Sequence, residues 1–115
     1  MLNIDEKFLL ETDFAQELYR KHAQRVAVID YHSHISPHDV AVNRTFDTIT
    51  SIWMENNPYV WRAMRANGVE EKYCTGTEVD DWQRFEKWAQ TMPYLMRSPL
   101  YLWPHLALKS VFGID

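Results

Sequence analysis

The amino-acid sequence predicts a mainly α-helical fold with one short strand. In several segments apolar residues recur three and four positions apart, which is the spacing of a helix with one buried face. Most of these segments follow a residue that commonly caps helices. Only Val26–Ile29 forms a continuous, mostly β-branched apolar run, and no internal repeat or linker divides the chain. We therefore treat residues 1–115 as a single unit.

The helices are predicted from their caps and from helical spacing. The first is expected over about residues 14–24, because Asp13 and Gln16 form a capping pair in front of apolar residues at helical spacing. The others are expected at 37–42 after Ser36, at 46–54, at 58–67 after Asn57, at 81–92 after Asp80, and at 99–113. Pro104 removes a backbone hydrogen bond from the last helix, so its regular part is expected to begin there.

The strand predicted at Val26–Ile29 ends at Asp30. A continuous apolar run of this kind is typical of a strand buried on both faces, as in a parallel sheet. A lone strand has no partner for its backbone hydrogen bonds. The sequence therefore implies a larger sheet, completed either by a second copy of the chain, which would make a homo-oligomer, or by a longer protein of which these residues are the front portion.

Charge and composition exclude several classes of protein. The chain carries 12 Lys and Arg against 16 Asp and Glu, a net charge of −4, without the clustered cations that track nucleic-acid phosphates. No apolar window approaches the length of a membrane span. With one cysteine and no secretory signal, we expect a cytoplasmic protein without nucleic-acid or membrane partners. The aromatic content of 14% suggests that some aromatic side chains form surfaces covered by a partner outside this chain.

Candidate chemistry follows the strand, at Asp30, His32 and His34. Alternate residues of an extended chain share a face, so the two imidazoles would lie side by side. Such a pair can ligate one divalent cation, and imidazole ligands favour zinc, with Asp30 orienting one ring. The alternative is a pair of solvated loop histidines. The position of the two histidines at the end of a buried strand favours the metal-binding interpretation. The required third ligand is expected outside this chain, because the nearest candidate, His38, is predicted to be exposed.

Several blocks of the sequence resemble the uronate isomerase family, also called glucuronate isomerase, which belongs to the amidohydrolase-like (β/α)8 barrels. The blocks are DYHSHISP from Asp30 and the segments 59–76, 81–93 and 97–114. The resemblance covers essentially the whole chain and corresponds to the family's N-terminal part. It implies a leading helix and first barrel strand at 1–35 and a helical insertion at 36–115. A barrel typically needs about 250 residues, so we expect these 115 residues to be inactive alone.

The resemblance implies an isomerase of hexuronates. The family interconverts D-glucuronate with D-fructuronate and D-galacturonate with D-tagaturonate. By resemblance His32 and His34 are two ligands of a divalent metal, expected to be zinc, and Tyr59 is the catalytic tyrosine beside the sugar. The chain departs from the family at Pro58, where related sequences have a histidine, and proline cannot transfer a proton. The alternatives are a helical fragment that self-associates without catalysis and a metal-dependent hydrolase of the amidohydrolase type.

Other candidate side chains each have two interpretations. Arg62 could bind a uronate carboxylate, or it could be a solvated arginine that pairs with Glu55 or Glu70. Three aromatic residues of the 81–92 helix are Trp82, Phe85 and Trp88. They could stack on a sugar ring, but their helical spacing predicts that they lie in the core. Cys74 has only Lys72 nearby, so we expect no nucleophilic role for it.

Overall fold

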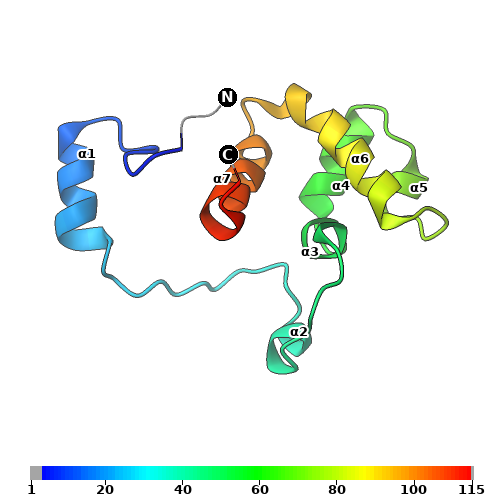
Figure 1. Ribbon diagram of the computed structural model, residues 1–115, viewed down its shortest axis with the longest axis horizontal. Coiled ribbons are helices and arrows are strands. Elements are labelled where there is room, and N and C mark those ends of the chain that lie inside the picture. The colour runs from blue at the N-terminus through cyan, green and yellow to red at the C-terminus, as the bar shows by residue number, and fades with distance from the viewer. Residues whose placement is uncertain (1–3, 115) are drawn as a thin grey trace. The chain divides into compact units, whose positions relative to one another are not determined.

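The computed structural model describes residues 4–114 and is helical in all of its regular parts (Figure 1). Its elements are α1 (Asp13–Leu18), a π-helix η1 (Tyr19–Ala23), α2 (Pro37–Ala41), α3 (Ile49–Met54), α4 (Pro58–Ala66), α5 (Glu71–Cys74), α6 (Asp81–Thr91), a 3-10 helix η2 (Met92–Leu95) and α7 (Pro99–Phe112). The chain divides into two compact units. One contains the chain up to His32 together with the segment from His105, and the other is Ser33–Pro104.

The strand predicted at Val26–Ile29 is wrong for residues 4–114, which contain no strand. Residues 27–33 have neither helix, strand nor turn, and the side chains of Val28 and Ile29 are 91% and 86% exposed. The physical reason is that β-branched residues favour extended backbone, whereas a strand also needs a neighbouring extended segment to accept its hydrogen bonds. The described residues supply no such segment.

Three predicted helix caps are confirmed. The side-chain oxygens of Ser36, Asn57 and Asp80 accept hydrogen bonds from backbone N–H groups in the first turns of α2, α4 and α6. The cap of α1 is Thr12 rather than Asp13, because the Thr12 hydroxyl accepts from the Ala15 N–H at 3.1 Å.

Two helix boundaries and one additional helix differ from expectation. The helix predicted at 46–54 begins at Ile49, after Thr48 caps it. The four-residue helix α5 was not predicted, since one turn is too short to show a period. The last helix, expected over 99–113, is α7, but the expectation that its regular part begins only at Pro104 is wrong, because α7 is helical from Pro99 onward. A proline there removes a single backbone donor while its fixed φ still suits a helix.

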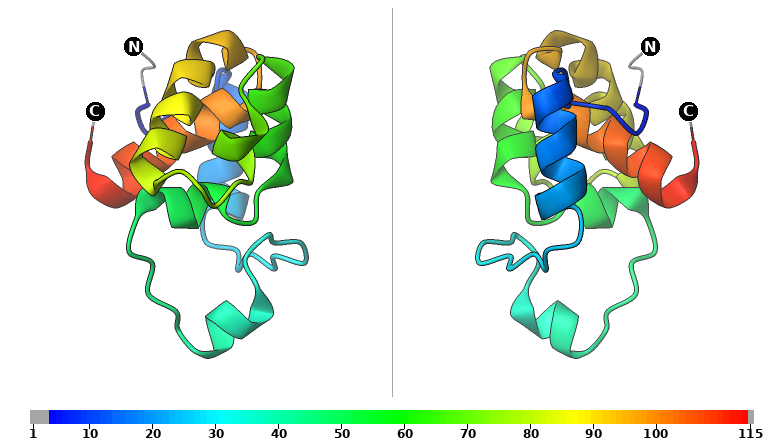
Figure 2. Two further views of the ribbon diagram at one scale, coloured as in Figure 1. Left: turned by 90° about the vertical axis from the view of Figure 1, so that its right-hand side faces the viewer. Right: turned by 90° about the vertical axis from the view of Figure 1, so that its left-hand side faces the viewer.

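Helices α3, α4, α5 and α6 form the hydrophobic core of the Ser33–Pro104 unit. Figure 2 shows the ribbon of these helices from two sides. Its fully buried apolar side chains are Met54, Val60, Met64, Cys74 and Trp88. Each of these helices contributes at least one of them, and α6 contacts all three others. The core therefore holds four short helices together that would be marginal in isolation.

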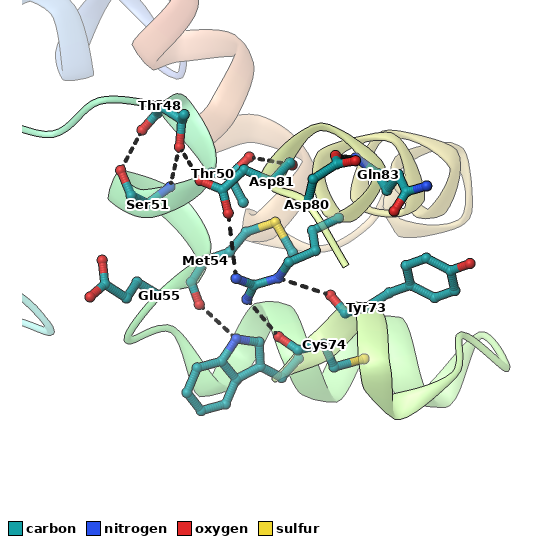
Figure 3. Close-up of polar contacts among 12 residues, drawn as sticks. Thr48, Thr50, Ser51, Met54, Glu55, Tyr73, Cys74, Asp80, Asp81 and Gln83 are labelled. Atoms are coloured by element: carbon teal, nitrogen blue, oxygen red, sulfur yellow. Dashed lines mark hydrogen bonds and ion pairs between the residues drawn. The ribbon is translucent and has the colours of Figure 1, made fainter. Parts of the chain in front are cut away.

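Hydrogen bonds between helices fix the packing of this core (Figure 3). The buried Thr50 hydroxyl donates to the backbone oxygen of Asp81 at 2.8 Å, which joins α3 to α6. The Arg84 guanidinium donates to the backbone oxygens of Tyr73 and Cys74 at 3.4 and 2.9 Å, which joins α6 to α5. Every buried side-chain nitrogen and oxygen in the described residues has a partner. The core thus carries little cost from unsatisfied polar groups.

None of the helices in residues 4–114 has the length and apolar character that a membrane span requires.

An ion pair at α5 makes the stability of this unit sensitive to acid. Arg65 Nε donates to Glu71 Oε2 at 2.6 Å, and the Thr75 hydroxyl also donates to this carboxylate. The hydrogen bonds from Arg65, with that from Thr75, lower the pKa of Glu71 from 4.5 to about 2. A carboxyl with a lowered folded-state pKa stabilises the fold above its unfolded pKa, and this contribution is lost as the pH falls toward 2.

We therefore expect Glu71→Gln to reduce the difference in urea midpoint between about pH 6 and about pH 3. The change should act by weakening the folded state near neutral pH, where the wild-type pair is intact. Glu86→Gln on the exposed face of α6 is the matched control and should keep the wild-type difference. An unchanged pH dependence in Glu71→Gln would contradict the assignment.

Candidate active site

The structure brings His34 and Tyr59 into direct contact. Tyr59 lies in the first turn of α4, whose start is set by the Asn57 cap and by Pro58 at the first helical position. His34 lies just before Ser36, the cap of α2. The two ring centroids are 5.2 Å apart and the rings are inclined by 12°, which is an offset stack of two flat rings. Two segments far apart in the sequence thus meet at two of the predicted site residues.

Arg62 joins this pair on the exposed side of α4. Its guanidinium carbon lies 5.8 Å from the centroid of the Tyr59 ring, one helical turn away. Neither predicted carboxylate partner binds it, since Glu55 pairs with Arg44 at 2.8 Å and Glu70 pairs with Lys72 at 3.1 Å. Within residues 4–114 no carboxylate lies at ion-pair distance from Arg62. We refer to His34, Tyr59 and Arg62 as the His–Tyr–Arg cluster.

A small cavity of about 60 Å³ lies beside His34. Its polar lining includes Asp39, Ser51, Asn56 and Asn57. That volume holds about two waters, at about 30 Å³ each, and is too small for a hexose. Sequence reasoning missed these polar residues, although the Asn-Pro pair that starts α4 could have pointed to Asn57.

His32 belongs to the other unit, at its boundary with the Ser33–Pro104 unit. Its backbone N–H donates to Asp30 Oδ1 at 3.1 Å, so this aspartate binds the backbone beside the predicted ligands. Among residues 4–114, no three or more His, Cys, Asp or Glu side chains are gathered closely enough to hold a metal ion. Ligation by His32 and His34, with a third ligand from outside the chain, stays a prediction.

Stacking and metal ligation use different parts of the His34 ring. The contact with Tyr59 involves the ring face, whereas an imidazole binds a metal through a lone pair in the ring plane. The side chain is half-buried. Imidazole nitrogen is a ligand type that suits a borderline-soft divalent cation such as zinc.

The remaining candidates divide between core and surface. Trp88 is buried and Phe85 is half-buried, as expected for core positions. The core prediction is wrong for Trp82, which is 73% exposed because it lies on the solvent side of the first turn of α6. Cys74 is buried, and burial raises the pKa of its thiol. A raised pKa disfavours the reactive thiolate, in agreement with the expectation that Cys74 is not a nucleophile.

Comparison with known proteins identifies the family. A model of the glucuronate isomerase family matches residues 1–115. The chain belongs to the glucuronate isomerase family. It is 54% identical over 112 residues to a uronate isomerase of Bacteroides thetaiotaomicron, a match that covers 97% of this chain and 24% of the relative. A uronate isomerase of Cellvibrio japonicus is 48% identical over 111 residues, covering 96% of this chain and 23% of the relative.

A uronate isomerase of Caldicellulosiruptor bescii is 46% identical over 112 residues, again with 97% of this chain and 24% of the relative covered. This member of the glucuronate isomerase family therefore spans about a quarter of the length of the curated relatives it matches. The family resemblance predicted from the sequence blocks is confirmed.

Proposed function

We propose that the complete protein containing this chain isomerises hexuronates between aldose and ketose forms, D-glucuronate to D-fructuronate and D-galacturonate to D-tagaturonate. Membership of the glucuronate isomerase family supports the reaction. The observation that supports a role for these residues is the His–Tyr–Arg cluster, which gathers three of the four predicted site residues. We include in this proposal a (β/α)8 barrel of the amidohydrolase-like type and a cytoplasmic location.

Tyr59 would serve the proton transfers between the sugar oxygens. Moving the carbonyl from C1 to C2 passes through an enediol. The enediol forms when C2 loses a proton and O1 gains one, and the ketose forms when C1 gains a proton and O2 loses one. The Tyr59 side chain is 47% exposed, so its phenol can reach a bound substrate. Its ring is held by the stack with His34. Pro58 has no side-chain proton to give, so the phenol would act without help from its neighbour.

Arg62 would bind the substrate carboxylate. A guanidinium can donate two parallel hydrogen bonds to a carboxylate, which fixes both the position and the orientation of the sugar acid. Arg62 is exposed and has no competing carboxylate among residues 4–114. One turn of α4 separates it from Tyr59, so one substrate could contact both side chains.

His32 and His34 would supply two imidazole ligands to a divalent metal, expected to be zinc. When bound, zinc supplies a Lewis acid that favours negative charge on a carbonyl oxygen. The third protein ligand would come from outside this chain.

The test of this function is Tyr59→Phe in the complete enzyme. The substitution keeps the ring and its stack but removes the hydroxyl, so kcat with D-glucuronate and D-galacturonate should fall about 10²- to 10⁴-fold. Tyr19→Phe in η1 is the matched control and should retain wild-type kcat. A wild-type kcat in Tyr59→Phe would refute the role of the phenol. Absence of any aldose–ketose conversion by the unaltered enzyme would refute the function itself.

A second candidate function is self-association of this segment on its own, without catalysis. The exposed apolar side chains of the segment that precedes His32 favour it, since Val28, Ile29 and Tyr31 are 91%, 86% and 96% exposed. Light scattering over a concentration series would then show dimers or larger species, and a strictly monomeric chain would count against it. Substrate profiling of the complete enzyme separates isomerisation from the third possibility, metal-dependent hydrolysis.

A further inference from the structure

A second hollow, of about 300 Å³, lies within the Ser33–Pro104 unit and shares no residue with the His–Tyr–Arg cluster. It lies where the end of α4 and the start of α5 face α6 and η2. Its lining is polar and aromatic, with Asn67, Glu70, Tyr73, Lys87, Gln90 and Tyr94. The volume is at the lower end of the range typical of small-molecule sites.

The charge of this hollow is set by Lys87. The Glu70 carboxylate on its lining is already paired with Lys72 at 3.1 Å, and that contact raises the pKa of Lys72. Lys87 Nζ lies 5.5 Å from the centroid of the Tyr73 ring and donates to Gln90 Oε1 at 3.2 Å. No carboxylate of residues 4–114 lies within ion-pair distance of Lys87. The hollow therefore offers one ammonium group whose charge is not neutralised by a protein carboxylate.

The groups around Lys87 suit a hydroxylated ligand. Gln90 Oε1 accepts from Lys87, and Asn67 Nδ2 donates to the backbone oxygen of Ala63 at 2.8 Å. The amide N–H groups of Gln90 and the amide oxygen of Asn67 are therefore the groups that can bind hydroxyls, and the tyrosines add phenols and flat apolar faces. Tyr94 is 77% exposed, so its ring is open to a ligand from solvent. The charged groups of the lining are the Lys87 ammonium and the Glu70 carboxylate, and Glu70 is paired with Lys72. Lys87 alone matches a single negative charge better than a phosphate dianion, which needs several cations or backbone N–H groups.

We propose that this hollow binds a carboxylate-bearing monosaccharide, a sugar acid, at a site separate from the His–Tyr–Arg cluster. Lys87 contacts the carboxylate, Gln90 and Asn67 bind hydroxyl groups, and the ring of Tyr94 covers one face of the sugar. The site goes beyond the isomerase function proposed above and does not depend on it, because it needs neither the metal nor the catalytic tyrosine.

The test is an NMR titration of the ¹⁵N-labelled 115-residue chain with D-galacturonate, and with uncharged D-galactose as the matched ligand. Amide resonances of residues 67–70 and 87–94 should shift with galacturonate. The apparent affinity should be about 10-fold weaker for galactose, which lacks the charged partner for Lys87. Lys87→Gln should reduce binding of galacturonate to the level of galactose, whereas Lys87→Arg should retain it. Lys21→Gln on η1 is the control and should bind as the wild type does.

Three results would overturn this site. They are equal shifts with galactose and galacturonate, unchanged galacturonate binding by Lys87→Gln, and galacturonate shifts confined to residues near His34, Tyr59 and Arg62. The last result would leave the isomerase proposal intact while removing the second site. A wild-type kcat in Tyr59→Phe together with Lys87-dependent binding of galacturonate would instead refute the role of Tyr59 and leave the second site intact. Far-UV circular dichroism of each variant verifies that the helices are retained.

Discussion

Trp88→Ala is expected to lower the free energy of unfolding of the Ser33–Pro104 unit by about 3–5 kcal/mol. The Trp88 side chain is only 2% exposed and lies at the centre of a core that joins four helices. Its removal takes away a large buried apolar surface and leaves a cavity that rigid helix packing can only partly close. Since domains of this size are stable by about 5–15 kcal/mol, the variant should be largely unfolded at modest urea concentrations.

Urea denaturation followed by far-UV circular dichroism measures this effect on the whole chain. Trp82→Ala is the matched control, because the same residue type lies on the same helix but is 73% exposed. The control should change stability by less than about 1 kcal/mol. Similar losses in both variants would show that α6 does not present Trp88 to the core as described.

The double substitution of His32 and His34 by alanine in the complete enzyme has the largest expected effect on activity. If these side chains are metal ligands, the variant should retain almost no bound divalent metal after purification without added metal. Loss of the Lewis acid should lower kcat/KM about 10³-fold or more, since a single group that stabilises developing oxyanion charge is worth about 10²- to 10³-fold. Elemental analysis and an isomerase assay on the same preparation measure both quantities.

His22→Ala is the control for the histidine prediction, because His22 is an exposed residue of η1. It should keep wild-type metal content and activity. If the double variant retained one metal per chain, the assignment of His32 and His34 as metal ligands would be refuted, whatever the effect on activity. A normal metal content with lost activity would instead point to the stack between His34 and Tyr59 as the reason for the loss.

Local sequence signals predicted most of the helices correctly. Ser36, Asn57 and Asp80 cap α2, α4 and α6 as expected, because a cap is a hydrogen bond to a backbone N–H two or three residues away and needs no distant partner. Thr12 and Asp13 are both good caps, so spacing alone could not choose between them. The one-turn helix α5 is held by packing in the core and by bonds from Arg84, neither of which leaves a period in the sequence.

The sequence by itself determined the family and the helical character, because these depend on blocks of residues in order and on local hydrogen bonding. It could not determine that Val26–Ile29 remains unpaired in residues 4–114, since a strand exists only when a second segment accepts its hydrogen bonds. Only the tertiary structure decided that His34 stacks on Tyr59, that Arg62 lies over the same ring, and that Lys87 faces a separate hollow. The stack of His34 on Tyr59 and the lining of the hollow join segments distant along the chain, whereas Arg62 and Tyr59 are neighbours on one helix. Contacts between distant segments are fixed by how the helices pack around the buried core.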